Sequence, residues 1–111
     1  LDRHDTDDGV SLEYQLHLPE NLIFFQGHFP EAAILPGIAQ LHWVMNFSKE
    51  QDIHLAFDSV DRLKFMRPIV PNTQVVLSIQ FLEKTQQLVF TYRSQGQKCS
   101  TGRIALKPRH V

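Results

Sequence analysis

Residues 26–37, QGHFPEAAILPG, place a titratable side chain among residues that shape the backbone. Proline restricts the backbone and glycine frees it, so a stretch with two of each has a specified shape. The imidazole of His28 has an unperturbed pKa of about 6.5, which suits a general base. A second imidazole, His42, follows fourteen residues later and is a further titratable group. The alternative for His28 is a histidine that only packs a loop, and for His42 a core or interface histidine.

A helix is predicted from Pro36 to about Glu50, because apolar residues recur at helical spacing and proline suits a first turn. Apolar residues cover nearly all its circumference, so we expect it to be buried. Its first amide groups lack helical partners and would stabilise a developing oxyanion, with Gly37 allowing a ligand to approach the backbone. Asn46 lies one turn after His42 and would hold its imidazole.

Most of the rest of the chain is predicted to form β-strands. Residues 10–18 alternate apolar and polar side chains, and residues 57–69, 73–84, 87–94 and 98–106 read as extended segments. Residues 2–9 are rich in aspartate and are expected to be a solvated lead-in. Strands joined by short turns pair antiparallel, and one helix must bury itself against them. We therefore expect a single α+β domain over residues 1–111, with one curled antiparallel sheet around a central helix.

Composition excludes several classes of function. The net charge of −1 offers no basic excess for nucleic acid, and no apolar run reaches the roughly 18 residues of a membrane span. The only cysteine, Cys99, has no intramolecular partner, and no basic-then-apolar leader is visible, so we expect a cytoplasmic protein. The histidines show no metal-ligand spacing, and we expect no metal and no other cofactor.

Two stretches, FFQGHFPEAAILPG (24–37) and DRLKFMRPIVPNTQVVLSIQFLEK (61–84), resemble the beta-hydroxyacyl-carrier-protein dehydratases of fatty-acid synthesis, which have the hot-dog fold. The likeness covers roughly residues 10–107. G-H-F-P followed six residues later by P-G is highly specific, whereas the second stretch alone is weak. The resemblance implies a protein that eliminates water from a 3-hydroxyacyl thioester on acyl carrier protein and leaves a trans-2-enoyl thioester.

The resemblance also implies residue roles in a site shared between two subunits. His28 would handle the proton at the α carbon, and the helix start at Gly37 would bind the thioester carbonyl. The neighbouring Pro36 and Ile38, with Phe29 of the motif, would contact the substrate. A carboxylate on the helix, fourteen residues after the histidine and supplied by the other subunit, would protonate the departing hydroxyl.

This chain departs from the family pattern at that second position. His42 stands where the carboxylate is expected, and no acid occurs between Glu31 and Glu50. In this respect the chain resembles divergent dehydratases of aryl-polyene-type lipid pathways. Either His42 replaces the acid or the site is altered. Two other interpretations stay open: a hot-dog thioesterase, and a half-site partner that lends His28 to a companion chain bringing the acid.

The implied partners are acyl carrier protein, through a phosphopantetheine-linked acyl chain, and a second hot-dog subunit. The second subunit would be a copy of this chain, in a homodimer or larger oligomer, or a different chain. Positive charge speeds encounter with an acidic carrier protein. The candidate docking residues are Arg62, Lys64 and Arg67, with Arg93, Lys98 and Arg103 as alternatives. A solvated strand face is the other explanation for the first group.

Overall fold

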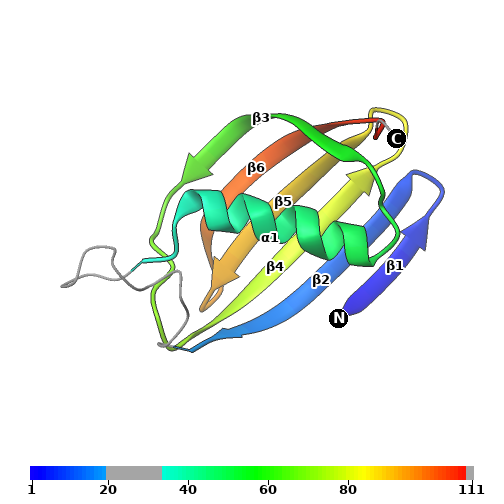
Figure 1. The fold of residues 1–111 in the computed structure, drawn as a ribbon. Helices are drawn as coiled ribbons and strands as arrows, with labels where there is room; N and C mark the ends of the chain where they lie inside the picture. The colour runs from blue at the N-terminus through cyan, green and yellow to red at the C-terminus, as the bar shows by residue number, and fades with distance from the viewer. Residues whose placement is uncertain (20–33, 110–111) are drawn as a thin grey trace.

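The computed structural model describes residues 1–19 and 34–109. In these ranges a six-stranded antiparallel sheet curls around a helix (Figure 1). The elements are β1 (Asp2–Thr6), β2 (Gly9–Leu18), α1 (Gly37–Glu50), β3 (Ala56–Phe65), β4 (Thr73–Leu82), β5 (Gln87–Ser94) and β6 (Gln97–Lys107). The strand order across the sheet is β1-β2-β4-β5-β6-β3, which leaves β1 and β3 at the two edges. The expected α+β architecture is confirmed.

The core lies between α1 and the concave face of the sheet. Leu12 of β2 lies opposite Ile79 of β4, and Tyr14 lies opposite Leu77. Residues opposite each other in an antiparallel pair point to the same face, so these four side chains share the face under the helix. All four are buried, as the alternation over residues 10–18 predicted. A slip of one residue would turn this whole set outward, so burial fixes the register.

Residues 2–8 are exposed, as expected of a solvated lead-in, but Asp2–Thr6 also form a strand, which the sequence analysis did not predict. β1 forms a hairpin with β2, from Asp2 opposite Glu13 to Thr6 opposite Gly9, although every residue of β1 is exposed. Backbone pairing requires no apolar side chains, which is why composition hid the strand. Arg3 holds β1 against the helix, because its guanidinium donates a hydrogen bond to the carbonyl of Gln51 at the end of α1. A positive charge at the C-terminal end of a helix also interacts favourably with the helix dipole.

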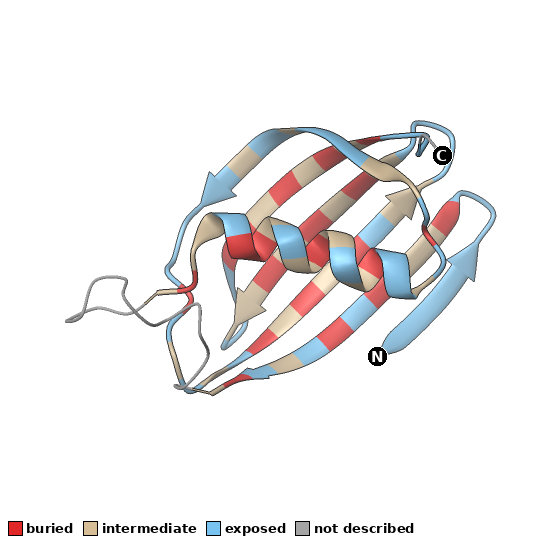
Figure 2. Ribbon diagram, viewed as in Figure 1, coloured by how far each residue is buried: buried red, intermediate tan, exposed pale blue. Residues whose placement is uncertain are grey.

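Helix α1 buries one side and exposes the other (Figure 2). The buried residues are Ala39, Gln40, Val44 and Ser48. The exposed residues are Ile38, His42, Asn46, Lys49 and Glu50. The expectation of a helix buried nearly all round was therefore wrong for this chain by itself. A single sheet covers only one side of a helix, so Ile38 on the other side stays exposed.

Strand β3 contains two irregularities that change which side chains face the helix. Its register against β6 shifts between Phe57 and Ser59 and again between Asp61 and Lys64. Such bulges insert a residue and re-aim the side chains that follow. As a result Phe57 lies opposite Leu106, Val60 opposite Ile104, and Phe65 opposite Ser100. Strict alternation would instead have turned Ser59 and Asp61 toward the helix.

Candidate active site

The start of α1 has donors available for a ligand. Pro36 is the N-cap and provides no side-chain cap, and the first turn contains no acidic residue. The amides of Ala39 and Gln40 both donate to the carbonyl of Pro36, at 3.1 and 3.2 Å. Within the described residues, the amides of Gly37 and Ile38 have no acceptor. Unpartnered amides at a helix N-terminus carry partial positive charge and are suited to bind a carbonyl oxygen that becomes negative.

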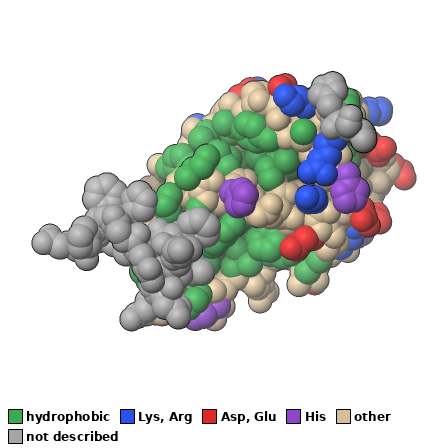
Figure 3. Space-filling view, in the orientation of Figure 1, with side chains coloured by type: hydrophobic (Ala, Val, Ile, Leu, Met, Phe, Trp, Pro, Cys, Tyr) green, Lys and Arg blue, Asp and Glu red, His purple; other side chains and the backbone are tan. Residues whose placement is uncertain are grey.

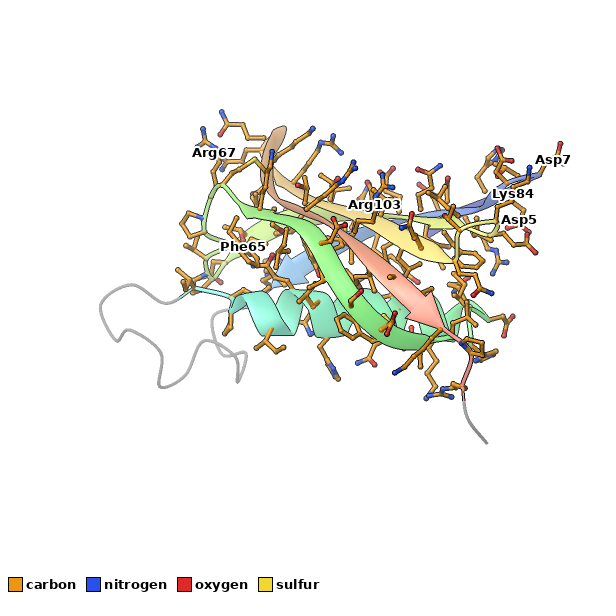
Figure 4. The ribbon with its side chains drawn as sticks, turned by 90° about the horizontal axis from the view of Figure 1, so that it is seen from above. Asp5, Asp7, Phe65, Arg67, Lys84 and Arg103 are labelled. Carbon is orange, nitrogen blue, oxygen red and sulfur yellow. The ribbon has the colours of Figure 1, made fainter. Side chains whose placement is uncertain are left out.

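An aromatic ring lies beside these amides. A Cβ atom added to Gly37 would lie 2.6 Å from Cζ of Phe65, so glycine at this position makes room for the ring. Phe65 is nevertheless 53% exposed, and Figure 4 shows it on the same side of the sheet as the beginning of α1. The sequence analysis did not single out Phe65. The signal was present, because Phe65 is an aromatic residue within the predicted extended segment 57–69, three residues before Pro68.

His42 lies in a groove along the outer side of α1. The groove has a volume of about 700 Å³, and β3 forms its opposite wall through Phe57. Its lining is mostly apolar, and the polar groups within it are His42, Asn46, Lys49 and Arg109. No hydrogen bond joins His42 to Asn46, so the expected support of the imidazole by that amide is not seen. The groove nonetheless places a titratable group one helical turn beyond Ile38.

Much of the surface around this groove is hydrophobic (Figure 3). The exposed large apolar residues of α1, β3 and the turn after β3 are Ile38, Phe57, Phe65, Met66 and Val70. Ile38 is 77% exposed. Exposed apolar surface of this kind marks a site where another molecule binds. The outer edge of β3 has no strand beside it among the residues that the structure describes, which leaves its backbone available for pairing.

His28 and Phe29 lie outside the described residues, so their roles and the distance from His28 to His42 stay predictions. The chain is held at Leu35, six residues after Phe29. The amide of Leu35 donates to the carbonyl of Ile69 at 2.7 Å, and Leu35 is buried. The segment that leads from the motif into the helix is therefore fixed to the turn that follows β3.

The basic residues occupy the end of β3 and the turn after it. Arg62, Lys64 and Arg67 are all exposed, and Arg62 adopts a positive φ of 54° within the second irregularity of β3. Arg67 lines a shallow recess of about 340 Å³ together with the β5–β6 turn. Arg93 and Lys98 lie opposite each other beside that turn. Figure 4 shows Arg67 at the same end of the molecule as Phe65, which is the end where α1 starts.

The remaining candidate groups of the described ranges are metal-ligating side chains and the thiol of Cys99. There, no three His, Cys, Asp or Glu side chains are grouped so that they would hold a metal ion. Cys99 is buried, and desolvation raises the pKa of its thiol, which disfavours the nucleophilic thiolate. Among residues 1–19 and 34–109 no helix is long and apolar enough to cross a bilayer.

Comparison with known proteins agrees with the geometry. Residues 3–103 match the ApeI-like family, described as ApeI dehydratase. The 3-hydroxyacyl-[acyl-carrier-protein] dehydratase FabZ of Tolumonas auensis is 38% identical over 71 residues, covering 55% of this chain and 47% of that protein. FabZ of Yersinia enterocolitica is 29% identical over 94 residues, covering 76% of this chain and 56% of its own length. The chain thus spans about half the length of these relatives.

Among solved structures, a chain of the dehydratase heterocomplex ApeI:P from Xenorhabdus doucetiae superposes with a TM-score of 0.86 and 33% sequence identity. The match covers 96% of this chain and 95% of that one. An (R)-hydratase from A. caviae involved in PHA biosynthesis has a TM-score of 0.66 at 14% identity, which shows a common fold only. With a single sheet curled around α1 and the family match spanning nearly its whole length, this hot-dog chain belongs to the ApeI-like family of dehydratases.

Proposed function

We propose that this protein eliminates water from a 3-hydroxyacyl thioester bound to acyl carrier protein, giving the trans-2-enoyl thioester. The observation that carries the proposal is the start of α1, where Gly37 and Ile38 present amides with no acceptor in the described chain. Removal of the α proton places negative charge on the thioester oxygen, and these amides would stabilise that charge. Membership of the ApeI-like dehydratase family and similarity to the 3-hydroxyacyl-[acyl-carrier-protein] dehydratases FabZ support the same reaction.

The two histidines divide the proton transfers in this proposal. His28 as a neutral imidazole accepts the α proton, and His42 as an imidazolium donates a proton to the departing hydroxyl. Water then leaves, and the double bond forms between the α and β carbons. His42 is solvent-exposed in the isolated chain and lines the apolar groove, which fits a site closed by a second subunit. The His28 of one subunit would then face the His42 of the other.

Dimer formation is part of the proposal. The unpaired edge of β3 offers backbone groups, and the apolar groove beside it offers surface to bury. A second subunit that continues the sheet at β3 would cover both at once. The similarity to a chain of a dehydratase heterocomplex favours one further candidate: this chain lends one histidine to a different hot-dog subunit. The family match does not favour thioester hydrolysis.

Acyl carrier protein is the proposed partner, with Arg62, Lys64 and Arg67 as docking residues. Arg67 lines the recess at the β5–β6 turn, which Arg93 and Lys98 flank, and it places positive charge at the end of the molecule where α1 starts. An acidic carrier protein bound there would bring its phosphopantetheine arm toward Gly37. The cytoplasm is the expected compartment, because a single buried thiol suits a reducing environment.

The proposal is tested by assaying the purified chain, alone and mixed with a candidate second hot-dog subunit. The substrates are 3-hydroxyacyl thioesters of acyl carrier protein that differ in chain length, and both dehydration and hydrolysis are measured. Dehydration by the chain alone supports the homodimer, and dehydration only in the mixture supports the half-site partner. Hydrolysis without dehydration, or no reaction under either condition, contradicts the proposed reaction.

A further inference from the structure

Gln40 is a polar side chain buried in the first turns of α1, and the proposed mechanism does not use it. It is 4% exposed and faces the sheet. Burying an amide group without hydrogen bonds is costly, so its partners indicate its role. Its Nε2 donates to the carbonyl of Leu35 at 3.2 Å, and its Oε1 accepts from the hydroxyl of Ser100 at 2.6 Å. Both ends of the side-chain amide are therefore satisfied.

The partners of Gln40 lie on two sides of the helix start. Leu35 belongs to the segment that enters the helix, and its own amide is held by Ile69. Ser100 belongs to β6 on the floor of the core and is fully buried. The side chain of Gln40 thus connects the entering segment to the sheet. A carbonyl such as that of Leu35 only accepts hydrogen bonds, which fixes the orientation of the Gln40 amide.

Three neighbouring strands contribute to the same support. Tyr92 of β5 and Phe65 of β3 both lie opposite Ser100 of β6, so the three form a row across the sheet. The hydroxyl of Tyr92 donates to the backbone carbonyl of Gln40 at 2.6 Å. The ring of Phe65 lies against Gly37. Burial raises the pKa of Tyr92, so its hydroxyl keeps the proton that it donates.

We propose that Gln40, held by Ser100, is a positioning residue that fixes the amides of Gly37 and Ile38 relative to the thioester carbonyl. The inference rests on the proposed dehydration. Negative charge on that oxygen develops only as the α proton leaves. Misplaced donors would therefore reduce the stabilisation of the transition state more than the binding of the substrate. Variants at this position should therefore lower kcat and leave KM nearly unchanged.

The first test replaces Gln40 with methionine, which keeps the size of the side chain and removes both hydrogen bonds. We expect kcat to fall about tenfold or more, as for small displacements of catalytic groups, with KM within about twofold of wild type. Ser100→Ala removes one bond and should lower kcat by a smaller factor. Ser48→Ala is the matched control, because Ser48 is a buried polar residue of α1 three turns from its start, and its kcat should equal that of wild type.

The second test replaces Gln40 with glutamate. A carboxylate oxygen would face the carbonyl of Leu35 without a proton between them, whereas the protonated acid restores a donor there. The ratio of kcat for Gln40→Glu to that of wild type should therefore fall as pH rises through the pKa of the new carboxyl group. A residue that only contributes to stability would lower the unfolding midpoint without producing this pH dependence at an assay temperature where both proteins are folded.

The results separate this inference from the proposed reaction. Wild-type protein that is inactive, alone and with a second subunit, overturns both. Active wild-type protein with unchanged kcat in Gln40→Met and Ser100→Ala, measured on folded samples, overturns only the positioning role. If Gln40→Met does not fold, Ser100→Ala and the pH profile of Gln40→Glu decide. Equal falls in kcat for these variants and for Ser48→Ala also contradict the inference.

Discussion

The two sides of α1 have different roles, although they belong to the same fourteen residues. The side toward the sheet carries Ala39, Gln40, Val44 and Ser48, all buried against strands that cross beneath the helix. The opposite side carries Ile38, His42 and Asn46, all exposed. The first side determines where the helix lies. The second side carries the proposed acid, His42, and lines the apolar groove.

In the proposed mechanism, this difference separates the residues that stabilise the fold from those that act on the substrate. A residue toward the sheet is held by packing within the chain, so its replacement changes the free energy of unfolding. A residue on the outer side has few partners within the chain, so its replacement changes what the groove binds or does. The start of the helix is where the two roles meet, because Gln40 faces the sheet while the amide of Gly37 is available to a ligand.

The largest expected effect is on the outer side, at His42. His42→Ala removes the proposed acid, and we expect dehydration to fall by about 10²–10⁴-fold, the usual contribution of general acid–base catalysis. The free energy of unfolding should change by less than about 0.5 kcal/mol, because the residue is exposed. Steady-state kinetics on the 3-hydroxyacyl thioester, together with urea unfolding, measures the two effects separately.

His54→Ala is the matched control for His42. His54 is also an exposed histidine but lies beyond the helix, 3.5 Å from a carboxylate oxygen of Asp52. We expect its activity to equal that of wild type. Full activity in His42→Ala, in whichever assembly makes wild type active, would remove His42 from the mechanism and leave the outer side of α1 as a binding surface only.

Val44 tests the side toward the sheet. It is completely buried, two residues after His42. Val44→Ala leaves a cavity and should lower the free energy of unfolding by roughly 1–3 kcal/mol, with little change in kcat where the protein is folded. Chemical denaturation gives the stability, and the same kinetic assay gives kcat. A large loss of kcat with stability unchanged would mean that the two sides of the helix are not separate in function.

Gly37 tests the point where the two sides meet. In Gly37→Ala the new methyl group would overlap the ring of Phe65, which is exposed enough to move away. We expect kcat/KM to fall about tenfold, because the methyl group and the displaced ring both obstruct the amides. Combining it with Phe65→Leu should recover part of the loss. If the double variant is no better than the single one, the ring and Gly37 do not form one site.

The sequence predicted those elements in which apolar side chains recur at the regular spacing of a strand or a helix. Leu12 and Tyr14 alternate with polar residues, and the period of apolar residues after Gly37 defined the helix to within one residue at its start. Strand β1 was missed because it is held by backbone pairing and by Arg3. The faces of β3 were hidden because its two irregularities break the period of two.

The site was predicted only in part. Gly37 and His42 were selected through the resemblance to the dehydratases, and both lie at exposed or accessible positions of α1. Gln40 and Phe65 were passed over, because their importance depends on Ser100 and Gly37, which come from distant parts of the chain. The exposed side of the helix did carry a signal. Polar residues at positions 42, 46 and 49 lie three or four residues apart, which is the spacing of one helical face.

The smallest expected effect has the opposite sign and concerns Ser48, on the buried side of α1. Its hydroxyl is buried and has no hydrogen-bond partner in the part of the chain that the structure describes. A hydroxyl without a partner loses its hydration and gains nothing, so Ser48→Ala should raise the free energy of unfolding by about 1 kcal/mol. Urea unfolding of the two proteins measures the change. A loss of stability would mean that the hydroxyl is satisfied in solution, for example by a buried water. A gain would show that the sheet-facing side of α1 tolerates stabilising changes far from Gly37, with kcat left as it was.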